Sequence, residues 1–298
     1  MVITPEQAKN LFAMEDSLRS IKSYRAINSA LQYFFQQRAI DPSLEGSKRA
    51  PVSLDTILGL PEDRKEMMAD VANAAARTLS DYTQKEYTVS DIDQINVMVN
   101  GSTLPVEIVP KVQEDTVYVK ALDHARLIGN ALYALLSGSE PTPHKVNNHM
   151  IVEGKVLGNH LYELTDAQRS ELFANPNFVR NKIKNDVLSF KLGLDDLTKE
   201  DNYVVGTGGN IVVIDFDVMD AYFNDAMMEQ YKAETCSELG ISSHEYDELY
   251  KFENYLFDKR VHGSQKEIGQ IIQIAELRNY PDLATYLTIQ LTGGSYER

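Results

Sequence analysis

Residues 195–217 read DDLTKEDNYVVGTGGNIVVIDFD, and this stretch decides the fold. Two runs of β-forming residues, Tyr203–Val205 and Ile211–Ile214, flank the turn signal Thr207–Asn210. Such runs on either side of a Gly-rich turn are typical of a β-hairpin. The acidic residues before the first run and after the second would then meet at the open end of the hairpin. Carboxylate and amide oxygens gathered there suit a divalent cation held against phosphates.

The acidic residues around the hairpin resemble the catalytic and metal-binding loops of the protein-kinase-like superfamily, whose pattern is Asp, then Asn, then Asp-Phe-Gly. Asn202 lies thirteen residues before Asp215, which suits that pattern. The resemblance implies that Asn202 and Asp215 bind Mg²⁺, and that Asp217, which replaces the Gly, binds a second metal ion or holds the loop. Asp196 lies six positions before Asn202 and not the family's five. Either the loop has one extra residue, or Asp201 takes the Asn role.

The same resemblance implies a role for the two acids at the start of the stretch. Asp196 would accept or align the proton of the acceptor hydroxyl, with Asp195 as the alternate. No His-Arg pair precedes Asp196, because Leu194-Asp195 stands there. The lead-in from Leu192 to Asp196 also resembles that of phosphoinositide-type kinases, which keeps a lipid acceptor open.

A second match lies upstream, where residues 116–122 read TVYVKAL. This run resembles the third strand of the kinase N-lobe, with Lys120 matched to the lysine that contacts the inner phosphates. Strand alternation buries the neighbours of Lys120 and directs its amine to one face. The apolar spacing of Asp123–Ser137 predicts a helix, where the family places the Glu partner of the lysine. This helix has no Glu; Asn130 lies near the expected position, and Asp123 is the nearest acid.

Further elements follow in the order that the resemblance implies. Two strands around an Asn-Gly turn are expected over 95–109, where backbone amides at Gly101 and Ser102 would meet the nucleotide phosphates. The remaining elements predicted from periodicity are strands at His149–Val152 and Lys155–Leu164, helices at Asp166–Phe173 and Asn177–Leu192, and a helical region from Val218 to Leu291. Before them we expect helices at residues 4 or 5 to 20, 24–37 and 61–82, with a linker at 41–51.

Together these patterns predict an α+β protein with a two-lobe protein-kinase-like fold: a small antiparallel sheet lobe, a helical lobe and an N-terminal helical extension. The expected divisions are 1–90 for the extension, 91–164 for the N-lobe and 165–298 for the C-lobe. The resemblance itself spans roughly Ile95 to Asp217.

The amino-acid composition limits the classes of partner that this protein is expected to bind. The formal net charge is −15 and the sequence pI is about 4.8, which argues against nonspecific nucleic-acid binding. Arg180, Lys182 and Lys184 form the densest basic cluster, and we interpret them as a solvated helix face or as a polyanion contact. Cys236 is the only cysteine, so an internal disulfide and a cysteine-cluster zinc site are excluded. No signal peptide or membrane span is evident. The expected location is the cytoplasm, or a host cell into which a bacterial effector is secreted.

The function that these observations favour is an ATP-dependent phosphotransferase, an atypical kinase resembling bacterial effector kinases. It would use ATP and Mg²⁺ to transfer the γ-phosphoryl group to a hydroxyl of a protein or small-molecule acceptor. The alternatives are a pseudokinase that serves as a nucleotide-binding scaffold, and a small-molecule, lipid or nucleotidyl transferase on the same fold. A third hypothesis is a helical interaction protein whose match is accidental.

Overall fold

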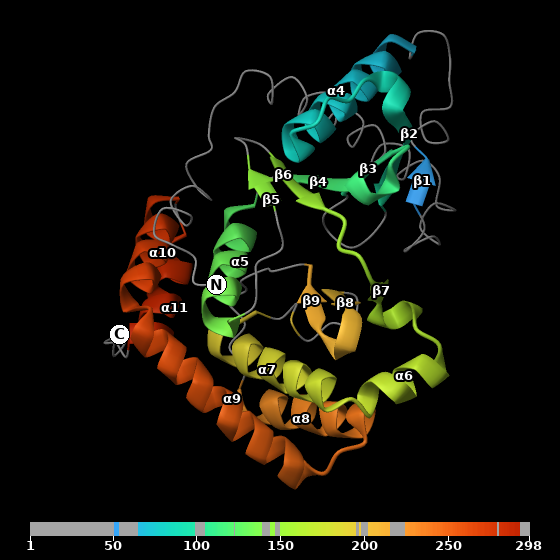
Figure 1. Ribbon diagram of the computed structural model, residues 1–298. Coiled ribbons are helices and arrows are strands. Elements are labelled where there is room, and N and C mark those ends of the chain that lie inside the picture. Colours follow the sequence, from blue (N-terminus) through green and yellow to red (C-terminus); the bar gives the residue numbers. More distant parts are fainter. Residues whose placement is uncertain are drawn as a thin grey trace, which may run out of the picture. The chain divides into compact units, whose positions relative to one another are not determined.

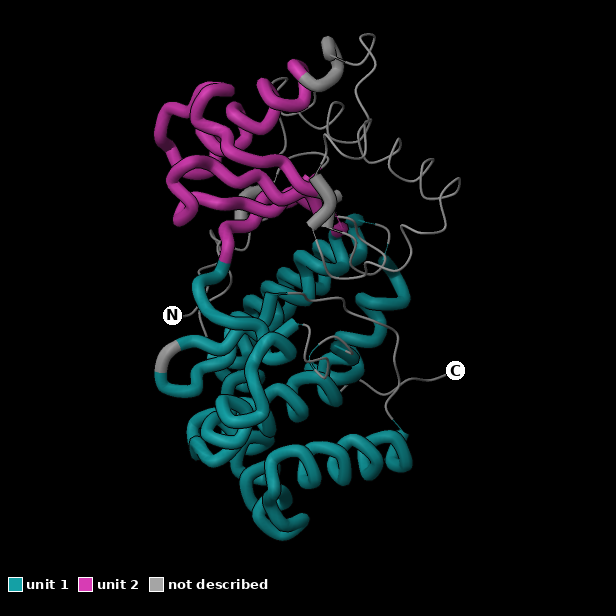
Figure 2. Tube along the Cα trace, turned by 90° about the vertical axis from the view of Figure 1, so that its right-hand side faces the viewer, with its two compact units in different colours: residues 1–10, 124–142, 156–298 teal, residues 11–123, 143–155 magenta. Residues whose placement is uncertain are grey.

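The computed structural model describes residues 51–53, 65–98, 105–121, 123–138, 144–146, 150–194, 197, 202–214, 224–278 and 280–292. Their contacts form two compact units, coloured separately in Figure 2. We call the described residues within 51–123 and 144–155 the sheet unit, and those within 124–138 and 156–292 the helical unit. The expected α+β class is confirmed at this level, because an antiparallel sheet is followed by a mostly helical region.

The sheet unit contains six strands in the order β1-β2-β3-β4-β6-β5, and every neighbouring pair is antiparallel. The strands are β1 (Pro51–Ser53), β2 (Ile92–Met98), β3 (Val106–Pro110), β4 (Val117–Ala121), β5 (His144–Val146) and β6 (Met150–Gly154). Because β6 pairs with β4, the short strand β5 stands at the edge (Figure 1).

Alternation along β3 and β4 divides the sheet into two faces. Val106 and Ile108 on β3 lie opposite Val119 and Val117 on β4, and none of the four is more than 2% exposed. The residues between them are polar: Glu107 lies opposite Tyr118. Since successive side chains of a strand point to opposite faces, one face is apolar and the other carries polar groups.

Helix α4 (Lys65–Thr83) completes the apolar core of the sheet unit. Its residues Val71, Ala74, Ala75 and Leu79 repeat at helical spacing, and each is at most 1% exposed. The helix contacts β2. At its end, the hydroxyl of Tyr82 accepts a hydrogen bond from the backbone N–H of Gly154, at 2.9 Å. A Cβ atom at Gly154 would lie only 2.6 Å from that hydroxyl oxygen, so a larger residue there would displace the Tyr82 hydroxyl.

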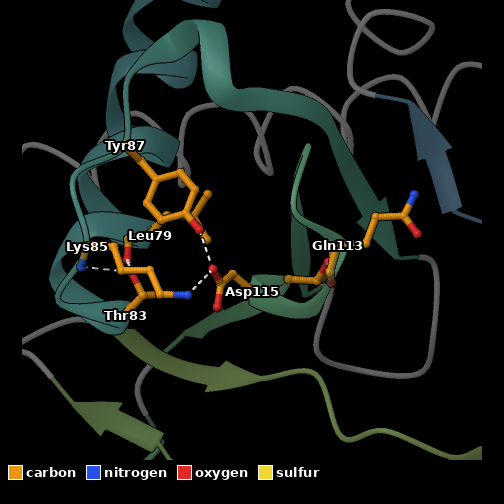
Figure 3. Close-up of polar contacts among 7 residues, drawn as sticks. Leu79, Thr83, Lys85, Tyr87, Gln113 and Asp115 are labelled. Carbon is orange, nitrogen blue, oxygen red and sulfur yellow. Dashed lines mark hydrogen bonds and ion pairs between the residues drawn. The ribbon is translucent and has the colours of Figure 1, made fainter.

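Polar contacts connect the segment between α4 and β2 to the turn between β3 and β4 (Figure 3). Lys85 Nζ lies 2.6 Å from Asp115 Oδ2, and the hydroxyl of Tyr87 donates to the same oxygen. Thr83 Oγ1 donates to the carbonyl oxygen of Leu79 at 2.8 Å and accepts from the backbone N–H of Lys85 at 3.2 Å. One carboxylate thus holds two side chains from the segment that leads from α4 into β2.

The helical unit consists of seven helices among the described residues and one small sheet. The helices are α5 (His124–Ser137), α6 (Asp166–Phe173), α7 (Pro176–Leu192), α8 (Asp225–Leu239), α9 (Ser243–Gly263), α10 (Gln265–Leu277) and α11 (Pro281–Thr292). The sheet has the order β7-β8-β9, with strands β7 (Asn159–His160), β8 (Tyr203–Val205) and β9 (Ile211–Val213). Figure 1 shows α7, α8 and α9 beside one another.

Helix α5 is the buried centre of the helical unit. Every residue from Arg126 to Ser137 is buried, and the helix contacts α7, α9 and α10. Burial of each leucine contributes about 1.5–3 kcal/mol, so α5 is a major part of this core. Two hydrogen bonds fix its C-terminal half: Tyr133 donates to Asn185 Oδ1 at 3.1 Å, and Arg260 donates to the carbonyl oxygen of Leu136 at 3.1 Å.

Several predicted elements are confirmed. The helices predicted at Asp123–Ser137, Asp166–Phe173 and Asn177–Leu192 correspond to α5, α6 and α7. The predicted hairpin corresponds to β8 and β9. The expectation of one strand over Lys155–Leu164 is wrong, because only Asn159–His160 is extended and pairs, and a 3-10 turn follows it. Strands β1 and β5 were not predicted. The helices predicted at 4 or 5 to 20 and 24–37 lie outside the described residues.

Candidate functional site

Lys120 points into the polar face of the sheet, where it meets a carboxylate. Its Nζ lies 2.8 Å from Glu153 Oε2, and each of the two side chains is only 9% exposed. In the register of β4 and β6, Lys120 lies opposite Ile151 and Tyr118 lies opposite Glu153. The two charged residues are therefore diagonal neighbours on one face, within reach of long side chains.

The polar face continues away from this ion pair across three strands. Asn96 on β2 lies opposite Glu107 on β3, which lies opposite Tyr118 on β4. Glu107 accepts from Asn96 Nδ2 at 3.1 Å and from the hydroxyl of Tyr118 at 3.0 Å. Asn96 and Glu107 are buried. Sequence reasoning missed Glu107 and Glu153; the available signal was one acid in each of two apolar strand patterns.

In the helical unit, the residues directly before and after the two predicted catalytic acids are buried. Leu194 and Leu197, on either side of Asp195 and Asp196, are fully buried. Ser189 Oγ donates to the carbonyl oxygen of Leu194 at 2.8 Å, and the N–H of Leu194 donates to the carbonyl oxygen of Ser189 at 3.1 Å. Gly193, at φ +65°, ends α7 in the left-handed conformation that glycine adopts without a steric penalty.

Strand β8 begins at Tyr203, directly after Asn202, and pairs with β9 in a single register. Tyr203 lies opposite Val213 and Val205 lies opposite Ile211. Beyond these pairs, the N–H of Ile214 donates to the carbonyl oxygen of Asn202 at 3.0 Å. Asn202 therefore stands across the open end of the hairpin from Ile214, the residue directly before Asp215.

The turn of the hairpin is docked on the start of α7. Gly208 and Gly209 adopt positive φ angles of 72° and 80°. Asn175 Nδ2 donates to the carbonyl oxygen of Gly208 at 3.3 Å, and a Cβ atom at Gly209 would lie 2.9 Å from the same nitrogen. The side chain of Asn175 also caps α7 by accepting from the N–H of Asn177. One asparagine thus fixes both the helix start and the turn.

A buried ionic group lies between α7 and its neighbours. Lys182 Nζ is 3.6 Å from Asp186 Oδ1 and 5.3 Å from the ring centroid of Tyr203. Asp186 Oδ2 accepts from the hydroxyls of Tyr246 at 3.0 Å and Thr235 at 3.3 Å. Burial acts to lower the pKa of Lys182, but the surrounding Tyr203 and acidic groups outweigh it, so the pKa lies above the ordinary lysine value. Lys182 thus remains charged inside the unit.

This group corrects one expectation from the sequence. Lys182 was expected to share a basic face with Arg180 and Lys184, but it is 4% exposed and points into the unit. The reason is helical geometry: at about 100° per residue, a side chain two positions away lies roughly 200° around the helix. Arg180 is exposed and pairs with Glu253, at 2.5 Å between Nε and Oε1. Its guanidinium also lies 5.0 Å above the ring of Phe252.

Lys184 lies half-buried near the same acid. Burial and the positive charges of Arg260 and Arg180 lower its pKa to about 8, although Glu253 acts in the opposite direction. Two of the three residues predicted to contact a polyanion, Arg180 and Lys184, are therefore close to one buried glutamate. Whether they bind a polyanion stays a prediction.

The other predicted site residues lie outside the described part of the chain. They are Gly101, Ser102, Asp195, Asp196, Asp201, Asp215 and Asp217. Within the described residues there is no group of three or more His, Cys, Asp or Glu side chains that could hold a metal ion. None of the described helices is long and apolar enough to cross a membrane.

Comparison with known proteins gave no further assignment. The chain matches no family model and no curated protein. The functional proposal therefore rests on the residues themselves.

Proposed function

We propose that this protein is an ATP-dependent phosphotransferase of the atypical kinase type. The observation that carries the proposal is at the open end of the β8–β9 hairpin, where the N–H of Ile214 donates to the carbonyl oxygen of Asn202. This bond connects the Asn of the predicted metal pair to the residue before its Asp. Amide and carboxylate oxygens are among the donors that bind Mg²⁺ in proteins.

The chemistry of the donor set fits the proposed cofactor. Asn202 and Asp215 would hold the ion, which when bound neutralises charge on the terminal phosphates of ATP. Asp196, or Asp195 as its alternate, would orient the acceptor hydroxyl and take its proton. Leu194 and Leu197, the residues on either side of these two acids, are fully buried, and the proposed role requires that the reacting group be held in position.

The resemblance implies that Lys120 would contact the inner phosphates of ATP. Its amine lies on the polar face, beside Glu153. A lysine that stays paired in a buried site keeps its direction, and it supplies positive charge in a setting where electrostatic attraction is stronger than in water. Catalysis by this set is positioning and charge neutralisation, and it requires no covalent intermediate.

The test is transfer of label from ATP. We would incubate wild type, Asp215→Ala and the control Asp70→Ala with Mg²⁺ and ATP labelled separately at the γ- and α-phosphates. Asp70 is an exposed acid of α4 and serves as the matched control. We expect γ-label to move to the protein itself or to a lysate component with wild type and Asp70→Ala. Loss of the metal ligand should reduce the rate at least about a hundredfold.

Each other outcome has a definite meaning. Full transfer by Asp215→Ala would contradict the assignment of the metal ligand. Transfer of α-label would identify a nucleotidyl transferase. If neither label moves but Mg-ATP raises the melting temperature, the protein is a nucleotide-binding scaffold.

A further inference from the structure

The carboxylate that faces Lys120 comes from the neighbouring part of the sheet. Helix α5, which follows β4 in the chain and occupies the place where the acid was expected, contains no Asp or Glu. Its main contacts are with α7, α9 and α10 in the helical unit. Glu153 on β6 pairs with Lys120 at 2.8 Å. The chain thus has a lysine–glutamate pair whose acid is supplied by a strand.

We propose that Glu153 is the positioning residue that holds Lys120 for the phosphates of a bound nucleotide, and that the ion pair is built into the sheet before the nucleotide binds. This inference rests on the proposed function. Residues Val117–Ala121 pair one to one with Met150–Gly154. Because this register fixes both backbones, the separation of the two charged groups is set by strand pairing and does not require a helix to move.

The surroundings of the pair favour a fixed geometry. Tyr118, which lies opposite Glu153, is itself held by Glu107, and Glu107 is held by Asn96. Buried polar groups with satisfied hydrogen bonds rigidify the structure around them. An ammonium carries three N–H donors, so contact with Glu153 does not exclude contact with phosphate oxygens.

The test distinguishes the effect of the ion pair on the reactivity of Lys120 from the effect of burial alone. Wild type and Glu153→Gln would be labelled without nucleotide by an amine-reactive acyl ester, and the rate at Lys120 measured by peptide mass spectrometry. The exposed Lys111 provides the internal reference. Glu114→Gln, an exposed acid of the same unit, is the control. Mg-ATP binding by calorimetry and γ-phosphate transfer are measured on the same preparations.

Loss of the pair should change both reactivity and catalysis. We expect Lys120 to be acylated at least tenfold faster in Glu153→Gln than in wild type, because the pair no longer holds the amine. The kcat for γ-transfer should fall by about a hundredfold, since small misplacements of a positioned group have effects of that size. The KM for ATP should change much less.

A second variant distinguishes a loss of activity from a folding defect. Replacing both residues, as in Lys120→Met/Glu153→Met, leaves no unpaired buried charge, and such exchanges are often neutral for stability. We expect this variant to keep the urea midpoint of wild type and to lose γ-transfer.

The outcomes distinguish failure of the role given to Glu153 from failure of the proposed function. If Glu153→Gln keeps the wild-type acylation rate and kcat, the inference is overturned while the proposed function stands. If wild type neither binds Mg-ATP nor transfers label, the proposed function fails, and the inference fails with it whatever the acylation rates.

Discussion

The hydroxyl of Tyr203 donates to the carbonyl oxygen of Leu197, a residue six positions earlier in the chain. Both residues are fully buried. The bond therefore connects β8 to Leu197, the residue that directly follows Asp195 and Asp196 in the chain. Burial raises the pKa of Tyr203 to about 12, so this donor keeps its proton throughout the neutral range.

Removing this hydroxyl should weaken the attachment of Leu197 to β8 without creating a large cavity. In Tyr203→Phe the buried carbonyl oxygen of Leu197 loses a donor, which costs about 1–3 kcal/mol. The measurement is the free energy of unfolding in urea, together with hydrogen exchange of the peptide that covers 194–202. Tyr255→Phe, at a residue 62% exposed, should change stability by a few tenths of a kcal/mol at most. Equal effects of the two variants would contradict the role given to the buried bond.

The buried pair of Lys182 and Asp186 on α7 predicts that replacing one member destabilises the protein more than replacing both. In Asp186→Asn, Lys182 stays buried without its countercharge, and breaking a buried pair in this way costs about 3–5 kcal/mol. In Lys182→Met/Asp186→Asn neither member of the pair is charged, and the Asn oxygen can still accept from Tyr246 or Thr235. We expect the double variant to be more stable than the single one in urea unfolding. A double variant at least as destabilised as Asp186→Asn would refute this account of the pair.

The contacts around Asp115 predict that the free energy of unfolding depends on pH. Hydrogen bonds from Lys85 and Tyr87 hold the pKa of Asp115 below its ordinary value. A carboxyl whose pKa is lowered by folding stabilises the protein above its unfolded pKa of about 4, and this contribution is lost as the pH falls through the folded pKa. The stability difference between wild type and Asp115→Asn should therefore be larger at pH 7 than near pH 3.

Urea unfolding of both proteins at the two pH values measures this difference. Asp70→Asn, an exposed acid of α4, controls for the general effect of removing a negative charge. A difference that does not change with pH would mean that the carboxylate charge of Asp115 contributes nothing through these bonds.

Elements with strong local signals could be predicted from the sequence. Helix α6 has the predicted bounds, because Thr165 and Gln168 form a capping box at its start. Helix α7 ends at Gly193 as expected, because glycine accepts the left-handed conformation. The β8–β9 hairpin was visible in its two β-branched runs and its glycines. In each case residues close in sequence determine the local structure.

Features that depend on strand order were not predictable in this way. The contact between Lys120 and Glu153 follows from the pairing of β4 with β6, although β5 lies between these two strands in the sequence. No local pattern encodes which strands become neighbours. Strands β1 and β5 have three residues each, too few to show an alternation. The inward position of Lys182 could have been derived, because it follows from helical angles alone.

The buried helix α5 also has a consequence for synthesis of the chain. Its residues from Arg126 to Ser137 are covered by α7, α9 and α10, and α10 begins only at Gln265. On a ribosome, which adds about 5–20 residues per second, α5 emerges many seconds before the helices that enclose it. A nascent segment this rich in leucine and alanine is the kind of sequence that chaperones bind, so production of this protein should depend on them more than its net charge of −15 suggests.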